Sequence, residues 1–399
     1  MNLVERLDKW IFWCLCGFSL MVSINAGIAD FFMGIAVFFT LIRFIKKVPG
    51  INIPKEYLLA IGIFLGSFFI LIFLNDQILI SLKVYWRYLN RMISLFVIIS
   101  IINEKKKIIF ISLFLFGGMT INNIAAIYKG VYLILEQYTY IRTSGLDNNI
   151  IGLAGELLIY IPILGIMAFD KPKGRFHIYV YVGLFIGIVA FLLNGTRMAW
   201  LIMLILLPYM LYEKNVDVKK IGVFLILLFF SLGIISYNVP AIQNRISSIT
   251  SKQDTSNQGH FFIVKDSIEM IKDAPLLGVG LGNFKEVFNE KYISEKTKVL
   301  QPKGVNHAHN TIVTIGAETG IIGVSAFCFM FGSFLFYSWQ GWKKEKKDVD
   351  LMFFIITLAH LLQGLTDFSF GLHQTMKIYF CLLGLYIQYR YNDIEYMKS

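Results

Sequence analysis

The residues best placed to do chemistry stand where a long polar stretch of the chain gives way to a long apolar segment. They are His307, His309 and Asn310, and Gly320 follows Asn310 after nine intervening residues. Histidine is the side chain whose ordinary pKa lies near neutrality, so it can take a proton from a hydroxyl group without extreme tuning. The pattern therefore predicts a proton-accepting group at a boundary between membrane and water. The alternative is that the two histidines only cap a helix.

The elements that must hold these residues are helices in a membrane. The chain has 399 residues, of which 56% are hydrophobic and 16% aromatic, and this is too apolar for a soluble domain of that size. The sequence predicts an all-α polytopic membrane protein that forms one integral membrane domain over residues 1–399. Twelve apolar runs are long enough to cross a bilayer as helices, at about 10–26, 28–45, 57–74, 85–102, 108–127, 149–169, 176–193, 197–212, 221–238, 310–339, 351–366 and 374–390.

The orientation of these spans follows from the basic residues between them. Lysine and arginine collect in alternate short loops, as they do on the cytoplasmic side of membrane proteins. This pattern places both termini on the cytoplasmic side and accounts for most of the net charge of +11, so no nucleic-acid partner is predicted. The residues that mark the cytoplasmic loops are Arg43, Lys46, Lys47, Lys55, Lys105, Lys106, Lys107, Lys171, Lys173, Arg175, Lys214, Lys219, Lys220, Lys343, Lys344, Lys346 and Lys347.

The cysteines do not form a metal-binding pattern. Cys14, Cys16, Cys328 and Cys381 all lie inside apolar runs, where a thiol packs well, and the sequence has no C-x-x-C pair. The outer side lacks an acidic cluster of the kind that binds Mg²⁺ or Mn²⁺. We therefore expect no disulfide, no metal and no other cofactor.

Recognition is expected in residues 239–308, a polar segment on the outer side that is too long for a passive link. Apolar residues at near-helical spacing predict an amphipathic helix over 261–271 that lies on the membrane surface, with Phe262, Val264, Ile268 and Ile271 as its apolar residues. Residues 276–284 predict a flexible turn with glycines at 278, 280 and 282. A nucleotide-binding loop is disfavoured, because no strand precedes these glycines and no Lys-Ser or Lys-Thr pair follows.

Cations on the outer side need an explanation because the topology rule disfavours them there. Lys83, Arg87 and Arg91 are spaced four residues apart and so share one face of the fourth span, although contact with lipid phosphates would explain them equally well. Arg197 begins the eighth span and Arg245 follows the ninth. A cation at this level indicates an anionic partner, and guanidinium groups can bind a diphosphate in a bidentate manner.

Three further polar residues lie in or next to the spans. Asp367 falls where the eleventh span returns to the outer face, and there it could orient His309, pair with an arginine or cap a helix. Glu156 in the sixth span and His360 in the eleventh are expected to make structural hydrogen bonds.

Taken together, these features resemble a known family. The twelve spans, the large outer loop before the tenth span, the run from Pro275 to Phe284, and His309-Asn310 with Gly320 nine residues on are similar to the O-antigen ligase and polymerase superfamily. The resemblance covers roughly residues 194–367. It implies that His309 is the catalytic histidine, supported by His307 and Asn310. It also implies that Arg197 and Asp367 occupy the family's arginine and acidic positions.

The resemblance implies a fold and a reaction. The fold would be a GT-C-like helical bundle with a large periplasmic loop that contains short helices, in the inner membrane of a bacterium. The reaction would transfer a glycan from undecaprenyl diphosphate to a sugar hydroxyl of lipid A-core, in lipopolysaccharide biosynthesis. His309 would act as the base, and Arg197 and Arg245 would stabilise the departing diphosphate, so that the anomeric carbon is inverted without a metal. Arg87 and Arg91 are further candidates for binding the donor, and the apolar spans would hold its lipid tail.

One position departs from the family's pattern. Many members have an arginine directly after a glycine just before the amphipathic segment, whereas this chain has His260 after Gly259. A protonated His260, or Arg245 and Lys265, would then bind the phosphate instead.

Other functions remain open at this point. A polymerase that joins repeat units on undecaprenyl diphosphate would use the same donor and the same site. A protein O-oligosaccharyltransferase is less favoured, because the chain lacks the extra domain common in that branch. A transporter or flippase would also have many spans, but transporters usually place their polar residues near the middle of the bilayer and often contain repeats, which we do not find here.

Overall fold

The described chain is helical. The computed structural model describes residues 3–46, 54–75, 77–102, 104–137, 142–169, 176–223, 226, 247 and 255–396, and no strand occurs within these ranges. The predicted all-α fold is confirmed. The elements are α1 (Leu3–Met21), α2 (Ala26–Ile45), α3 (Lys55–Phe73), α4 (Ile78–Ile101), α5 (Lys105–Gln137), α6 (Ile150–Phe169), α7 (Phe176–Asn194), α8 (Arg197–Glu213), α11 (Thr255–Asp273), α12 (Phe284–Val287), the π-helical turn η1 (Phe288–Tyr292), α13 (Glu295–Leu300), α14 (Thr311–Glu345), α15 (Asp348–Gly364), the 3-10 turn η2 (Ser369–Gly371) and α16 (His373–Tyr396).

Eleven of the twelve predicted spans coincide with helices, namely α1 to α8 and α14 to α16. Most of the predicted ninth span, 221–238, lies outside the described residues. Within the described chain, six helices are both long and apolar enough to cross a membrane, and these are α2, α3, α5, α6, α7 and α14. The chain is therefore a polytopic helical membrane protein, and the count of twelve spans stays a prediction.

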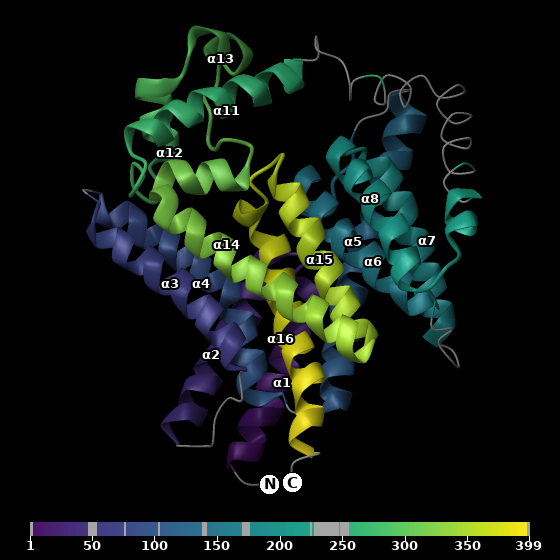
Figure 1. Cartoon of the computed structure of the whole chain (residues 1–399). Coiled ribbons are helices and arrows are strands. Elements are labelled where there is room, and N and C mark those ends of the chain that lie inside the picture. The colour runs from purple at the N-terminus through teal and green to yellow at the C-terminus, as the bar shows by residue number, and fades with distance from the viewer. Residues whose placement is uncertain are drawn as a thin grey trace.

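Three helices from the end of the chain occupy the centre of the bundle. Figure 1 shows α14, α15 and α16 crossing the middle of the molecule, where α16 packs on α4, α14 on α3 and α15 on α6. Aromatic rings fill the space between them: the ring centroid of Phe331 lies 5.7 Å from that of Tyr379 and 6.1 Å from that of Phe370. Edge-to-face and offset aromatic pairs of this kind add stabilisation beyond the burial of their area. The middle of α14 and the turn before α16 are thus held in a well-packed core.

Several charged and polar groups inside the helices have partners, as expected in a membrane-embedded fold. Lys377 of α16 pairs with Asp30 of α2, and Arg390 Nε lies 3.1 Å from Asp350 Oδ1. Glu156 accepts a hydrogen bond from Asn122 Nδ2 at 3.1 Å, which confirms the structural role predicted for it. His360 likewise forms a contact of 3.5 Å between its Nε2 and Ser369 Oγ.

The helices α11, α12 and α13 form a separate lobe above the bundle, at the end of the molecule opposite to the start of α1 (Figure 1). The lobe has its own apolar core, made by Ile263, Met270, Phe284, Phe288, Val305, Ala308 and Ala317. The predicted amphipathic helix is confirmed and is longer than expected, at 19 residues. Its predicted apolar face is right only in part. Ile271 packs against the lobe core, but the buried positions are Ile263, Ser267 and Met270, and Ile268 is 42% exposed.

The glycine-rich segment and α14 meet at a break in α14. Gly320 has φ +60° and ψ −160° inside this helix, a break that the sequence interpretation missed. The glycine-rich segment forms main-chain hydrogen bonds with α14 at this break: Gly280 N donates to Glu318 O at 3.0 Å, and Ile321 N donates to Pro275 O at 2.9 Å. A Cβ atom on Gly320 would lie 2.3 Å from the carbonyl carbon of Leu276, so glycine is required there. The turn predicted to be flexible is therefore fixed by main-chain hydrogen bonds.

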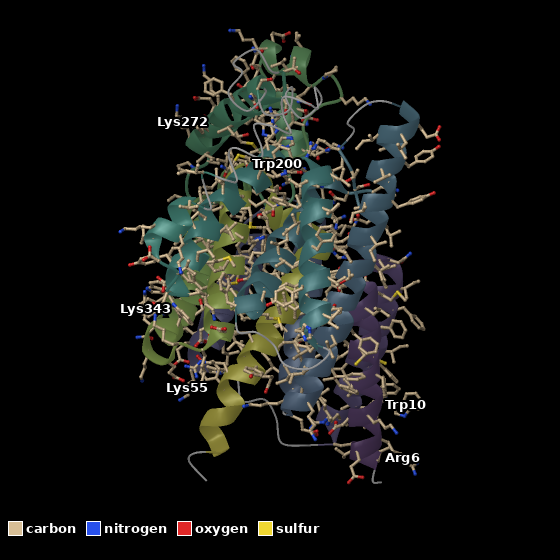
Figure 2. The ribbon with its side chains drawn as sticks, turned by 90° about the vertical axis from the view of Figure 1, so that its right-hand side faces the viewer. Arg6, Trp10, Lys55, Trp200, Lys272 and Lys343 are labelled. Atoms are coloured by element: carbon tan, nitrogen blue, oxygen red, sulfur yellow. The ribbon has the colours of Figure 1, made fainter. Side chains whose placement is uncertain are left out.

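Charged residues lie at both ends of the molecule. In Figure 2, Arg6 and Lys55 lie toward the end where α1 begins, while Lys272 lies in the lobe at the opposite end. Helix α1 begins and α16 ends at the same end of the molecule (Figure 1). The first and last described helices thus have their outer ends opposite to the lobe.

Candidate active site

The start of α14 is fixed by the side chain of Asn310. This residue caps the helix, because its Oδ1 accepts the N–H of Val313 at 3.0 Å. Its Nδ2 donates to the carbonyl oxygen of Leu365, just past the end of α15, at 2.8 Å. One asparagine therefore caps α14 and ties it to the α15–α16 connection.

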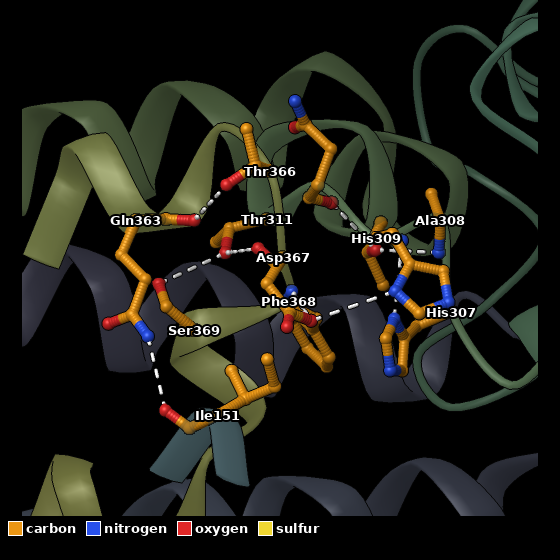
Figure 3. A network of polar contacts seen from close by, with 12 residues as sticks. Ile151, His307, Ala308, His309, Thr311, Gln363, Thr366, Asp367, Phe368 and Ser369 are labelled. Carbon is orange, nitrogen blue, oxygen red and sulfur yellow. Dashed lines mark hydrogen bonds and ion pairs between the residues drawn. The ribbon is translucent and has the colours of Figure 1, made fainter. Parts of the chain in front are cut away.

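Two threonines complete this tie. Thr311 Oγ1 donates to the carbonyl oxygen of Asp367 at 3.1 Å, and Thr314 Oγ1 accepts the N–H of Ala308 at 3.1 Å (Figure 3). Thr314 Oγ1 also donates to the carbonyl oxygen of Asn310 at 2.8 Å. The turn that carries the histidines and the turn that carries Asp367 are held against each other through their main chains.

His309 lies in the left-handed region of the backbone, with φ +49°. Residues other than glycine adopt this conformation infrequently, although asparagine, aspartate and histidine do so more often than the rest, and such conformations cluster at functional sites. The N–H of His309 donates to Nδ1 of His307 at 3.2 Å, which supports the turn from within. The conformation directs the imidazole of His309 toward Asp367.

His309 and Asp367 form a pair. Nδ1 of His309 lies 3.8 Å from Oδ1 of Asp367, at ion-pair distance, and the two side chains are 31% and 17% exposed. The same Oδ1 accepts the N–H of Phe368 at 2.7 Å. Burial by itself would raise the pKa of Asp367, but the bond and charge of His309, the charge of His307 and the Phe368 amide together lower it. An ionised Asp367 that faces Nδ1 leaves Nε2 of His309 as the nitrogen that can take a proton.

His307 packs beside this pair. Its ring centroid lies 4.4 Å from that of His309 and 5.6 Å from that of Phe368. Burial, together with the charges of His309 and His260, lowers the pKa of His307 to about 4, although Asp367 opposes the shift. His307 is therefore neutral at pH 7, as its role as a hydrogen-bond acceptor requires.

His260 comes to the same place from the lobe. Its ring centroid lies 4.5 Å from that of His309, with the ring planes inclined by 30°. This is the position at which the chain departs from the expected glycine–arginine pattern, and α11 places it directly against the candidate base. The structure thus brings together His260, His307, His309, Asn310 and Asp367, all of which were predicted from the sequence.

Arg197 begins α8, at the corner where α7 ends. Asn194 and Thr196 order this corner: Asn194 Nδ2 donates to the carbonyl oxygens of Thr143 and Ile150, at 2.9 Å each, and Thr196 Oγ1 donates to Asn194 Oδ1 at 2.6 Å. A cation in the first turn of a helix opposes the helix dipole, whereas an anion is favoured there. Arg197 thus lies in the first turn of α8, at an ordered corner between α7 and α8.

The other predicted donor-binding arginines lie in different surroundings. Arg91 is buried, and its Nη1 and Nη2 donate to the carbonyl oxygens of Phe370 and Gly371 at 2.7 and 3.0 Å. These contacts give Arg91 a role in holding the turn that follows Asp367. Arg87 is exposed one helical turn earlier on α4. Arg245 lies outside the described residues.

Sequence reasoning missed several residues that build the site. Phe368 orients Asp367 through its amide and covers His307 with its ring, and Thr311 and Thr314 join the two turns. The sequence offered one indication of their role, which is that Phe368 follows Asp367 and that Thr311 follows Asn310. Glu318 was also missed, although a charge in an apolar span is a signal of a role. Its carboxylate accepts the backbone N–H groups of Gly282 and Phe284, and so it holds the glycine-rich turn against α14.

Three of these side chains are of a type that binds metals. His307, His309 and Asp367 each offer one ligand atom, and the three atoms lie within 4.8 Å of one another. The sequence predicted no metal, and this prediction rested on the absence of an acidic cluster. The histidines were assigned to proton transfer instead.

Fold and site define the chain as an all-helical membrane protein with a histidine–carboxylate pair at the start of a broken helix, beneath a lobe on one side of the bundle. Residues 182–328 match the family described as O-antigen ligase, which confirms the resemblance to that superfamily. The matched segment includes Arg197, His260, His307, His309 and Gly320, and it ends before Asp367. No curated protein matches the chain. Over these residues the chain is therefore similar to the O-antigen ligase family.

Proposed function

We propose that this protein is an O-antigen ligase that transfers a glycan from undecaprenyl diphosphate to a sugar hydroxyl of lipid A-core. The observation that carries the proposal is the pair of His309, just before α14, and Asp367, just after α15, at 3.8 Å. His309 lies inside the segment that matches the O-antigen ligase family. A hydroxyl acceptor needs a base, and a diphosphate-linked donor already has a good leaving group. The pair of His309 and Asp367 supplies the base that the acceptor hydroxyl needs.

In the proposed reaction, Nε2 of His309 takes the proton of the acceptor hydroxyl while its oxygen attacks the anomeric carbon of the donor glycan. The bond between that carbon and the diphosphate oxygen breaks, and its electron pair leaves with undecaprenyl diphosphate. A single displacement of this kind inverts the anomeric carbon. Asp367 stabilises the imidazolium that forms and keeps Nδ1 protonated, as a carboxylate does for a catalytic histidine.

The charge that develops on the diphosphate requires cations. Arg197 at the start of α8 is the first candidate, because the helix dipole adds to its field there. Arg87, exposed on α4, and His260, beside His309, are further candidates for binding the donor, and Arg245 remains one from the sequence. Arg91 would act through the turn that it holds. The reaction would need no metal, because these groups supply the positive charge.

We further propose that the protein lies in the inner membrane of a bacterium, as a single membrane domain with both termini in the cytoplasm. The lobe, which belongs to the predicted periplasmic segment 239–308, and the site beneath it would face the periplasm. The basic loops support this orientation, and so does the separation of Lys272 from Arg6 and Lys55 in Figure 2. Membrane lipids would surround the helices, and the lipid tail of the donor would lie among them.

The test is transfer by the purified full chain from undecaprenyl-diphosphate-linked glycan, with and without lipid A-core, in the presence of EDTA. We expect labelled glycan on lipid A-core. If the donor glycan instead lengthens without that acceptor, the protein is a polymerase. If no product forms in either reaction with native donor, the proposed transfer is wrong.

A further inference from the structure

The histidine cluster has a second chemical capacity besides proton transfer. His307, His309 and Asp367 place two imidazole nitrogens and one carboxylate oxygen within 4.8 Å of one another. The two histidines lie in the turn before α14, and Asp367 lies in the turn after α15. Hydrogen bonds of Asn310 and Thr311 join the two turns. The three ligands are therefore held together by the fold rather than by one flexible loop.

The chemistry of the three ligand atoms decides which metal ion they would bind. Imidazole with carboxylate suits zinc and neighbouring transition metals, whereas Mg²⁺ and Ca²⁺ prefer oxygen ligands alone. Three protein ligands also leave a fourth tetrahedral position open for water. Bonds of about 2.0–2.2 Å would require the ligand atoms to approach to about 3.4 Å from one another. The side chains of His309 and Asp367 are 31% and 17% exposed, which leaves room for that movement.

We propose that His307, His309 and Asp367 form a binding site for Zn²⁺, and that Zn²⁺ bound there inhibits glycan transfer. The first half stands on the geometry of the three side chains. The second half rests on the proposed function, in which His309 is the base.

Inhibition follows from the tautomer of His309. As a base, this residue keeps its proton on Nδ1, toward Asp367, and accepts the new proton at Nε2. The nitrogen that faces Asp367 is Nδ1, so a metal shared with that carboxylate takes the lone pair of Nδ1 and forces the proton to Nε2. A protonated Nε2 cannot accept another proton. Zinc and the acceptor hydroxyl therefore require opposite states of the same ring.

His307 is prepared for a metal. Its Nδ1 accepts a hydrogen bond and so carries no proton, and metal binding at this nitrogen does not have to displace one. Its Nδ1 accepts the N–H of His309 at 3.2 Å, so in this tautomer the proton is on Nε2 and the metal would take the Nδ1 lone pair. Zinc binding should therefore release the His309 amide, which gives a structural signature apart from activity.

The binding test uses the purified full chain in detergent, freed of metal by EDTA and dialysed. Zn²⁺ is titrated by calorimetry with Mg²⁺ as the comparison, Co²⁺ absorption reports the coordination geometry, and hydrogen exchange follows the His309 amide. We expect one Zn²⁺ per chain, no heat with Mg²⁺, a tetrahedral Co²⁺ spectrum and faster exchange at His309.

Two variants test whether Zn²⁺ binds at the histidine cluster. His307→Asn keeps an acceptor close to the place of Nδ1 and removes the imidazole, and it should weaken Zn²⁺ binding by at least about tenfold. His177→Ala removes a histidine at the start of α7, outside the cluster, and should bind Zn²⁺ like the wild type. Equal affinity of His307→Asn and wild type, or the absence of stoichiometric binding to wild type, would overturn the site.

The transfer assay tests the second half. Zn²⁺ should inhibit wild type at the concentrations at which it binds, EDTA should restore transfer, and His307→Asn should need at least about tenfold more Zn²⁺ relative to its own activity without zinc. Stoichiometric binding without inhibition would refute the inhibition alone. Activation by Zn²⁺ would refute both the inhibition and the metal-independent mechanism. A chain that binds Zn²⁺ but transfers no glycan under any condition would refute the proposed function and leave the metal site standing.

Discussion

At the scale of residues, the site is assembled from main-chain contacts that hold a few reactive side chains. His309 is strained at φ +49°, and Asn310, Thr311 and Thr314 keep its turn in place. Sequence reasoning found His309, Asp367 and His260, because histidine and aspartate at a membrane boundary are conspicuous. It could not place His260 against His309, because that contact depends on how α11 packs on α14.

Removing the charge of Asp367 should slow transfer. Asp367→Asn keeps the shape of the side chain but no longer stabilises an imidazolium at His309, so we expect transfer to fall at least about tenfold. Steady-state transfer to lipid A-core measures the loss. The matched control is Asp273→Asn in the lobe, which removes an exposed ion pair with Lys291 and should leave transfer near wild type. Equal losses in both variants would contradict a role for Asp367 in the reaction.

The turn at His307 should depend on pH in a defined direction. In the folded chain the pKa of His307 is lowered to about 4, chiefly by burial, whereas an unfolded histidine takes a proton near pH 6.5. The neutral form is thus favoured by folding, and the stability that it contributes is complete above pH 6.5 and is lost as the pH falls toward 4. Hydrogen exchange at the His309 amide, corrected for its intrinsic rate, should stay slow at pH 7 and accelerate as the pH falls from about 6.5 toward 4. Fast exchange already at pH 7 would contradict this account.

At the scale of elements, α14 connects the two conspicuous motifs of the sequence. The glycine-rich segment and the residues around Gly320 are far apart in the chain but share main-chain hydrogen bonds at the break. Their sequence features predicted a turn and a long span correctly. The break itself was not predictable, because a glycine in an apolar run is compatible with an unbroken helix, and only the close approach of Leu276 reveals why it is needed.

Alanine at Gly320 should therefore destabilise the fold. A Cβ atom there meets the Leu276 main chain at 2.3 Å, and φ +60° is itself unfavourable for alanine by about 1–2 kcal/mol. We expect Gly320→Ala to lower the unfolding temperature of the purified protein. Gly332→Ala is the control in the same helix, since a Cβ atom there has no neighbour within 4 Å. It should be neutral or slightly stabilising, and a similar drop in both variants would argue against a special role of the break.

At the scale of the whole molecule, composition and charge were the strongest predictors. Apolar runs located eleven helices, because a bilayer demands helices of a fixed minimum length. They gave the bounds of α2, α3, α6, α7, α8 and α15 to within three residues but missed one end of α1, α4, α5, α14 and α16 by six to ten residues. The lobe was expected to hold short helices, but its core could not be foreseen. That core depends on Phe284 and Phe288 stacking 5.1 Å apart next to Ile263, from segments separated by the glycine-rich turn.

The predicted orientation can be tested with single cysteines. Lys272→Cys in the lobe and Lys344→Cys at the end of α14 are both exposed positions, in a chain whose exposed Cys328 is replaced by alanine. A maleimide that cannot cross the membrane should label Lys272→Cys in spheroplasts and should label Lys344→Cys only after lysis. Labelling of both before lysis, or the reverse order, would contradict the orientation.

The most direct test of the central claim is transfer by His309→Asn. Asparagine tolerates the left-handed backbone at this position but cannot act as a base, so the variant separates chemistry from folding. With an unfolding temperature equal to that of wild type, transfer from undecaprenyl-diphosphate-linked glycan to lipid A-core should fall by about 10²–10⁴-fold. Transfer near the wild-type rate by the folded variant would remove His309 as the base and with it the mechanism proposed for this protein.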